Sequence, residues 1–230
     1  MRAVLLNKEI NENDIGNELT LDGDSARHLI KVIRIKKFER ILLLNGQGCK
    51  SEVEITHIDR KTLTLKVISW QQVQDSRRIS LFLGLPKKDA FESIVKMSSE
   101  IGIKNIYLYR SDFSQHPIEI NERIERIEES AIVQSNNPFK INFYDVSTFE
   151  EAFSKYSNVV HFSTFSNSEI KEDRFDDEVL MVIGPEAGFS EGEEDVINSF
   201  KNVSVLNLDT NIMRAPTALA VASGYILKSF

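Results

Sequence analysis

Two loops near the C-terminal end of the sequence combine small, turn-forming residues with a charged side chain. The first lies in IGPEAGFS, where Gly184, Ala187 and Gly188 would let the backbone approach a ligand closely and Glu186 carries the charge. The second lies in LNLDTNIMRAPTALA, where Arg214 directly precedes a helical pattern. Loops of this composition contact ligands through backbone N–H and C=O groups, so the sequence predicts a ligand crevice.

Each loop follows an apolar run that would position it. Residues 179–183 and 203–208 are mainly apolar, and such short runs are typical of parallel strands buried on both faces. Ligands of open α/β sheets bind at the carboxyl ends of the strands. Both loops are therefore expected at one edge of one sheet.

From Ile79 onward the sequence has the pattern of an α/β domain. Apolar strands alternate with amphipathic helices, which favours a parallel sheet covered by helices. The expected strands are 79–85, 103–109 and 159–164. The first expected helix begins at an Asp89–Glu92 capping box and ends at Gly102. The other expected helices are 121–134, 191–199 with Ser190 as its cap, and 215–227.

Residues 1–70 show a β-rich pattern instead. Its strongest signal is Asn45-Gly46, a turn dipeptide between the apolar stretches 41–44 and 53–58, which is typical of a β-hairpin. The other expected elements are a strand over 62–68 and a short helix over 25–33 with Ser25 or Asp24 as its cap. We expect two domains, 1–70 and 79–230, joined by a polar linker over 71–78.

The composition is that of a soluble globular protein, with 41% hydrophobic and 27% charged residues. No stretch is long and apolar enough for a membrane span, and the first residues do not form a signal peptide. A cytoplasmic protein is expected, which also fits the single cysteine, Cys49. The four histidines are far apart and none has a partner at metal-ligand spacing, so no structural metal is expected.

The net charge of −7 argues mildly against nucleic acid as a partner, but the charges are unevenly distributed. Residues 1–70 hold 12 Lys and Arg against 10 Asp and Glu, and six of these cations lie in SARHLIKVIRIKKFER. A local basic patch attracts phosphate even on an acidic protein, because more distant exposed charges are screened. A solvated helix face would have the same composition, so the residues alone leave both interpretations open.

The two loops also carry a family resemblance. IGPEAGFS resembles the IGPEGGFS signature of the ribosomal RNA small subunit methyltransferase E family, and LNLDTNIMRAPTALA resembles its LG-x-RILR-x-ETA segment. That family's HL-x-x-V-x-R segment matches His28, Leu29, Val32 and Arg34. The resemblance implies an N-terminal PUA-like β-barrel that binds RNA, followed by a SPOUT α/β domain with a C-terminal trefoil knot at about 159–230.

The resemblance further implies a cofactor, partners and the residues that bind them. S-adenosylmethionine would be the cofactor, and 16S ribosomal RNA of the small subunit would be the substrate. A second copy of the chain would bind through the knotted domain to form a homodimer. The implied cofactor-binding residues are Phe162, Ser163, Thr164, Ile183, Gly184, Pro185, Glu186, Gly188, Leu206, Leu208, Asn211, Ile212, Met213, Ala215, Thr217 and Ala218. The implied RNA-binding residues are Arg2, Arg27, His28, Arg34, Lys36 and Lys37.

The implied reaction is methylation of uridine N3, a poor nucleophile until its proton leaves. Arg214 would stabilise the negative charge that then spreads over N3 and the carbonyl oxygens. The alternative for Arg214 is an ion pair with Glu186 or Asp209 that only ties the loops together. Glu186 would accept the proton or orient the cofactor's amine, or else it serves as a carboxylate at a helix N-terminus.

Four positions depart from the family pattern. Ala187 replaces a glycine, Asn211 replaces the first arginine of RILR, and Pro216 replaces the glutamate of R-x-ETA, although proline is well tolerated in a first helical turn. The arginine expected after Gln134-Ser135 is missing, with Lys140 as its candidate substitute. These changes leave the identity of the proton acceptor open. They also leave two alternatives to uridine N3 methylation: methylation of a ribose 2′-O or another base position, and a non-catalytic RNA-binding protein that keeps the cofactor pocket.

Overall fold

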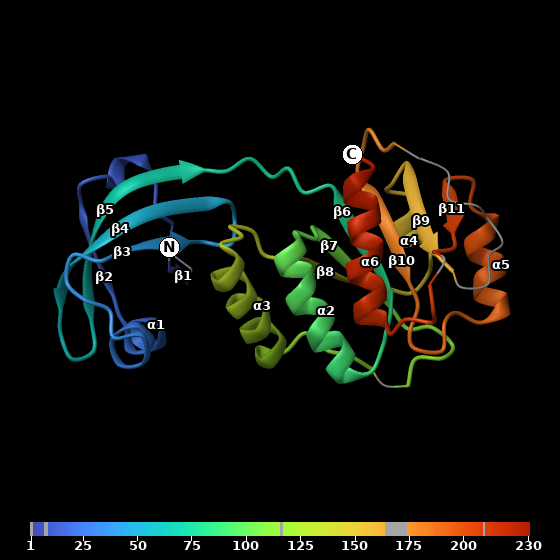
Figure 1. Ribbon diagram of the computed structural model, residues 1–230, viewed down its shortest axis with the longest axis horizontal. Coiled ribbons are helices and arrows are strands. Elements are labelled where there is room, and N and C mark those ends of the chain that lie inside the picture. Colours follow the sequence, from blue (N-terminus) through green and yellow to red (C-terminus); the bar gives the residue numbers. More distant parts are fainter. Residues whose placement is uncertain (1, 7–8, 116, 164–173, 209) are drawn as a thin grey trace. The chain divides into compact units, whose positions relative to one another are not determined.

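The computed structural model describes residues 2–6, 9–115, 117–163, 174–208 and 210–230 (Figure 1). The chain divides into two compact units. The first unit comprises residues 1–76 and 129–140, and the second comprises residues 77–128 and 141–230. No helix in the described ranges is long and apolar enough to cross a membrane.

The first unit is built on a five-stranded sheet. Its strands, in spatial order, are β1 (Ala3–Leu5), β3 (Arg40–Leu44), β4 (Cys49–Ile58), β5 (Leu63–Gln72) and β2 (Glu18–Leu21). β1 pairs with β3 in parallel, and the other neighbours are antiparallel. Alternate residues of β4 and β5 are buried, which gives the unit an apolar core on one face of the sheet.

The predicted hairpin is confirmed as the β3–β4 pair. Gly46 and Gly48 have φ values of 76° and 95°, which glycine adopts without strain. The side-chain oxygen of Asn45 accepts the backbone N–H groups of Gln47 and Cys49 at 2.8 and 2.9 Å and so holds the turn closed. The β5 strand extends to Gln72, two residues into the stretch expected as a linker.

The N-terminal stretch of this unit also contains two short helical segments. The 3-10 turn η1 (Glu12–Asp14) is closed by a capping box with Asn11. The helix α1 (Gly23–His28) continues directly into a π-helical turn, η2 (Leu29–Ile33). The predicted helix therefore exists, but its predicted cap is wrong: the N-cap is Asp22, whose side chain makes no capping hydrogen bond.

The second unit is built on a six-stranded sheet in which every neighbouring pair is parallel. The strands, in spatial order, are β11 (Val203–Leu206), β9 (Asn158–Phe162), β10 (Val179–Ile183), β6 (Ile79–Gly84), β7 (Asn105–Tyr109) and β8 (Asn142–Val146). The helices are α2 (Lys88–Ile101), α3 (Glu122–Ser135), α4 (Glu150–Phe153), α5 (Glu191–Ser199) and α6 (Ala215–Lys228), of which α3 contributes residues to both units.

Apolar side chains cover both faces of this sheet. Leu81 and Met181 pack with α2 and α6 on one face, whereas Phe82 and Val182 pack with α4 and α5 on the other. This alternation along β6 and β10 explains why both strands are continuous apolar runs in the sequence. The α/β architecture predicted from Ile79 onward is confirmed, while β8 and α4 were not predicted.

The helix ends show which sequence signals were correct. α5 is capped by Ser190 as predicted, since its Oγ accepts the N–H of Glu193 and its N–H donates to the Glu193 carboxylate. α2 ends at Gly102 with φ of 89°, also as predicted. The Asp89–Glu92 capping box is wrong, because the N-cap of α2 is Lys87 and the carboxylate of Glu92 binds the guanidinium of Arg123 at 2.6 and 2.8 Å.

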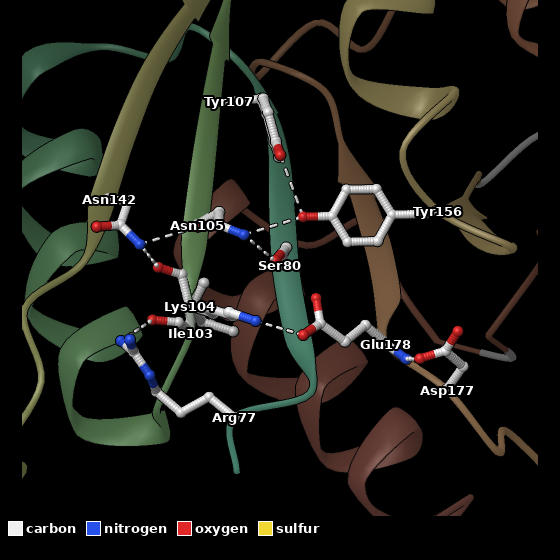
Figure 2. Close-up of polar contacts among 10 residues, drawn as sticks. All are labelled: Arg77, Ser80, Ile103, Lys104, Asn105, Tyr107, Asn142, Tyr156, Asp177 and Glu178. Carbon is white, nitrogen blue, oxygen red and sulfur yellow. Dashed lines mark hydrogen bonds and ion pairs between the residues drawn. The ribbon is translucent and has the colours of Figure 1, made fainter. Parts of the chain in front are cut away.

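A polar network, most of it buried, joins residues near the amino ends of the strands (Figure 2). The amide nitrogen of Asn105 donates to the hydroxyls of Ser80 and Tyr156 at 3.1 and 3.0 Å, and the Tyr156 hydroxyl lies 3.2 Å from that of Tyr107. Asn142 donates to the side-chain oxygen of Asn105 at 3.0 Å. Burial and the neighbouring Tyr156 hydroxyl raise the pKa of Tyr107 well above its ordinary value. These polar groups satisfy one another and lie at the edge opposite the two loops.

Candidate functional site: a crevice at the carboxyl ends of three strands

One cavity lies where β9, β10 and β11 end and α6 begins. Because these strands are parallel, their following loops meet at the same edge of the sheet, as predicted. The described residues that line it are His161, Phe162, Ser163, Ile183, Gly184, Pro185, Glu186, Ala187, Gly188, Phe189, Glu194, Leu206, Asn207, Leu208, Thr210, Ile212, Met213, Ala215 and Ala218.

The first loop packs closely against two glycines, one in the loop and one at the end of β6. A Cβ on Gly84 would lie 2.6 Å from Cδ of Pro185, and a Cβ on Gly184 would lie 3.2 Å from the backbone of Gly188. The N–H of Gly188 donates to the carbonyl of Pro185 at 2.9 Å, which closes a turn with φ of 77° at Gly188. The loop therefore presents a compact, largely backbone surface to the cavity.

Glu186 lines the cavity and also ties this loop to α2. Its carboxylate accepts the backbone N–H of Lys87, the N-cap of α2, at 3.0 and 3.4 Å. A carboxylate is favourable at a helix N-terminus because the unpaired N–H groups there carry partial positive charge. Glu186 is exposed, so its carboxylate is also accessible to solvent or to a ligand.

Arg214 is exposed at the start of α6, where it is the N-cap residue. Its side chain forms no ion pair within the part of the chain that the structure describes, and Glu186 bonds to Lys87 instead. Asp209, the other partner considered for Arg214, lies outside the described residues. Arg214 itself does not line the cavity, but its neighbours Met213 and Ala215 do. Pro216 occupies the first turn of α6.

The lining contains thirteen of the residues predicted to bind a cofactor: Phe162, Ser163, Ile183, Gly184, Pro185, Glu186, Gly188, Leu206, Leu208, Ile212, Met213, Ala215 and Ala218. Asn211 and Thr217 are exposed and do not line it. Thr164 lies outside the described residues.

The sequence did not single out the pair His161 and Glu194, which also lies at this cavity. His161 is 2% exposed, and its Nε2 lies 2.9 and 3.0 Å from the two carboxylate oxygens of Glu194. Its ring packs against Phe189, with centroids 5.7 Å apart. Nδ1 is buried and has no hydrogen-bond partner among the described residues. The available signal was a histidine inside an otherwise apolar strand, directly before the crevice.

The predicted RNA-binding residues all belong to the first unit and are exposed. Arg27 pairs with Asp24 at 2.8 Å, and Arg2 pairs with Glu39 at 3.2 Å. Arg34, Lys36 and Lys37 form no ion pair with any described carboxylate. These three cations lie between η2 and β3.

The family comparison defines the class of protein. The model of the RNA methyltransferase domain matches residues 73–227, and that of the RNA methyltransferase PUA domain matches residues 21–68. The chain belongs to the RNA methyltransferase family, with a PUA domain in its N-terminal part.

Individual relatives agree with this class. Ribosomal RNA small subunit methyltransferase E of Rickettsia conorii is 22% identical over 95% of this chain and 92% of its own, and that of Bacillus subtilis is 23% identical over 86% and 85%. The resemblance to the methyltransferase E family is thus confirmed.

Two solved structures share the fold. The enzyme of that name from Neisseria gonorrhoeae, bound to S-adenosylmethionine, has a TM-score of 0.82 at 20% identity and covers 99% of this chain and 97% of its own. A methyltransferase of Legionella pneumophila, also in complex with S-adenosylmethionine, has a TM-score of 0.77 at 18% identity and covers 98% and 96%.

Proposed function

We propose that this protein transfers a methyl group from S-adenosylmethionine to N3 of a uridine in 16S ribosomal RNA of the small subunit. The observation that carries the proposal is the convergence of the two signature loops on one cavity, with an arginine beside it that pairs with no described carboxylate. The relatives named ribosomal RNA small subunit methyltransferase E support the choice of RNA. The cytoplasm is the compartment in which such a substrate is found.

The cavity fits the proposed cofactor. Its walls are largely apolar side chains together with the backbone of Gly184 and Gly188, which suits a flat nucleoside with polar edges. The residues that would hold it are the thirteen predicted residues of the lining, and we keep Thr164, Asn211 and Thr217 as proposed contacts. When bound, S-adenosylmethionine supplies an electrophilic methyl group, and the chain has to orient the acceptor and exclude water.

In this proposal Arg214 acts on the acceptor base. Its guanidinium would lie beside the uracil ring and stabilise the negative charge that develops when the N3 proton leaves. Glu186 is the proposed proton acceptor, although its hydrogen bond from Lys87 also gives it a role in holding the loop. Pro216 supplies no such group at the position where the family has glutamate.

The remaining parts of the proposal concern the whole chain. We propose that 1–70 is the RNA-binding domain, that Arg2, Arg27, His28, Arg34, Lys36 and Lys37 contact phosphates, and that 79–230 is the catalytic domain. The strand order supports a knotted path at about 159–230, because β9 lies between β10 and β11, which both follow it in the chain. A homodimer would form through this knotted domain.

A second candidate is a non-catalytic RNA-binding protein that retains the cofactor pocket. It is favoured by two observations: Pro216 cannot take a proton, and Glu186 is engaged by Lys87. The enzyme is favoured instead by Arg214, whose side chain forms no ion pair with any carboxylate that the structure describes.

Mapping of modified nucleosides in ribosomal RNA from a deletion strain tests the function directly. A deletion strain should lack one N3-methyluridine in 16S RNA, and the wild-type gene should restore it. Loss of a ribose methyl or of another base methyl would assign a different acceptor. Unchanged RNA would favour the non-catalytic candidate.

Arg214→Ala tests the mechanism. We expect kcat/KM to fall on the order of 10²–10³-fold, because the arginine acts on charge that exists only in the transition state. The affinity for S-adenosylmethionine, measured by calorimetry, should stay the same. Arg126→Ala is the matched control, since Arg126 is an exposed arginine of α3 that pairs with the exposed Glu122. Full activity of Arg214→Ala would remove this residue from the mechanism.

A further inference from the structure

The segment between η2 and β3 contains two residues in the left-handed backbone conformation. Arg34 has φ of 55° and Phe38 has φ of 70°. A positive φ is unfavourable for a bulky side chain and persists only where the surrounding structure imposes it. Such outliers occur often at binding sites.

Backbone hydrogen bonds to β4 impose this conformation. The N–H of Phe38 donates to the carbonyl of Ile55 at 2.8 Å, and the N–H of Ile55 donates to the carbonyl of Glu39 at 3.0 Å. The N–H of Glu39 donates to the carbonyl of Lys36 at 3.2 Å, which closes a β-turn with Phe38 at its third position. A positive φ at that position is the feature of a type II turn, where glycine is the usual residue.

The side chain of Phe38 does not explain why phenylalanine occupies a glycine position. It is 67% exposed and belongs to none of the apolar clusters of the described residues. Its ring therefore contributes little to the core of the first unit, while its backbone conformation costs stability. The strained backbone that holds this exposed aromatic ring is better explained by a ligand than by folding.

The neighbouring side chains indicate which ligand. Nζ of Lys37 lies 5.0 Å from the centroid of the Phe38 ring. Lys36, Lys37 and Arg34 are exposed, and none of them pairs with a described carboxylate. An exposed aromatic ring among cations that pair with no described carboxylate is the combination with which proteins bind single-stranded nucleic acid, because bases stack on the ring while cations neutralise the phosphates.

We propose that Phe38 is a stacking platform for an unpaired RNA base, with Arg34, Lys36 and Lys37 holding the adjacent phosphates. This inference rests on the proposed RNA substrate. It extends that proposal by stating that the first unit recognises unpaired rather than double-helical RNA. A base inside a helix is already stacked on both sides, so the ring can bind only a base in a loop, a bulge or a single strand. The match of residues 21–68 to an RNA methyltransferase PUA domain includes this segment.

Phe38→Gly in the full-length protein is the decisive variant. The glycine removes the ring and also relieves the backbone strain, so binding and stability should respond differently. We expect about tenfold weaker binding of a fluorescent single-stranded RNA, while the melting temperature stays the same or rises. The slope of log affinity against log salt should not change, because no charge is removed. Lys37→Ala should instead reduce that slope by about one.

Two further variants and a second RNA complete the test. Phe38→Trp should retain the affinity for the single strand, and Ile15→Ala should have no effect, since Ile15 is an exposed apolar residue of the same unit outside the basic segment. A duplex of the same sequence should bind Phe38→Gly as well as it binds the wild type. Wild-type affinity of Phe38→Gly for the single strand, or an equal loss for the duplex, would overturn this inference alone. Failure of the wild-type protein to bind either RNA would overturn the proposed function as well.

Discussion

Close packing at single glycines shapes the crevice. Gly84 ends β6, and a Cβ at this position would lie 2.6 Å from Cδ of Pro185, the proline of the first signature loop. The proline ring cannot rotate away, because it is part of the backbone. The sequence singled out Gly184 and Gly188 but not Gly84, since the residue that Gly84 contacts is about a hundred positions away.

Replacement of Gly84 by alanine should disturb both the fold and the site. We expect Gly84→Ala to lower the free energy of unfolding by about 1–3 kcal/mol through overpacking. It should also weaken S-adenosylmethionine binding, because the loop that carries Glu186 must shift. Urea unfolding and calorimetry measure the two effects. Gly192→Ala is the matched control, since nothing lies within 4 Å of the added Cβ. Gly192→Ala lies in α5 and should raise the free energy of unfolding by about 0.5–1 kcal/mol. Equal behaviour of the two variants would contradict the packing argument.

At the scale of elements, the ion pair between Glu92 and Arg123 joins α2 to α3. The bidentate hydrogen bonds from Arg123 lower the pKa of the Glu92 carboxyl below its ordinary value, against the opposing effect of burial. A carboxyl with a lowered pKa in the folded state contributes stability above its unfolded pKa. That contribution is lost as the pH falls through the folded pKa.

Glu92→Gln should therefore have a pH-dependent effect on the melting temperature. The variant should melt below the wild type at neutral pH. The difference should shrink in acid, where the wild-type carboxyl is itself protonated. Glu122→Gln is the control, because its pair with Arg126 is exposed on both sides and should contribute little at any pH. A difference that stays constant down to the acid range would show that Glu92 acts through packing rather than charge.

The elements that the sequence predicted well have local signals. β10 is a continuous apolar run, and α5 begins with a capping box whose two members are three residues apart. The wrong capping box at Asp89 has the same local pattern, but Arg123, 31 positions away, takes the carboxylate. β8 was not predicted because only some of its residues are apolar and it lies at the edge of the sheet. His161 was missed as a site residue for a related reason, since its partner Glu194 comes from α5.

At the scale of the whole molecule, the two units divide the proposed work. Arg34 and Lys37, which pair with no described carboxylate, belong to the first unit, and all described residues that line the cavity belong to the second. Charge reversal of both, Arg34→Glu with Lys37→Glu, should weaken RNA binding and flatten its salt dependence. The affinity for S-adenosylmethionine should not change. A loss of cofactor affinity, or an unchanged salt slope, would contradict this division.

The first unit is assembled from two separated stretches of chain, residues 1–76 and 129–140. During synthesis it therefore stays incomplete until residue 140 has left the ribosome, even though its sheet is encoded before residue 73. The crevice comes later still, because its wall includes Ala218. Since domains generally fold as units during translation, we expect the nascent chain to complete the first unit before the crevice of the second unit exists.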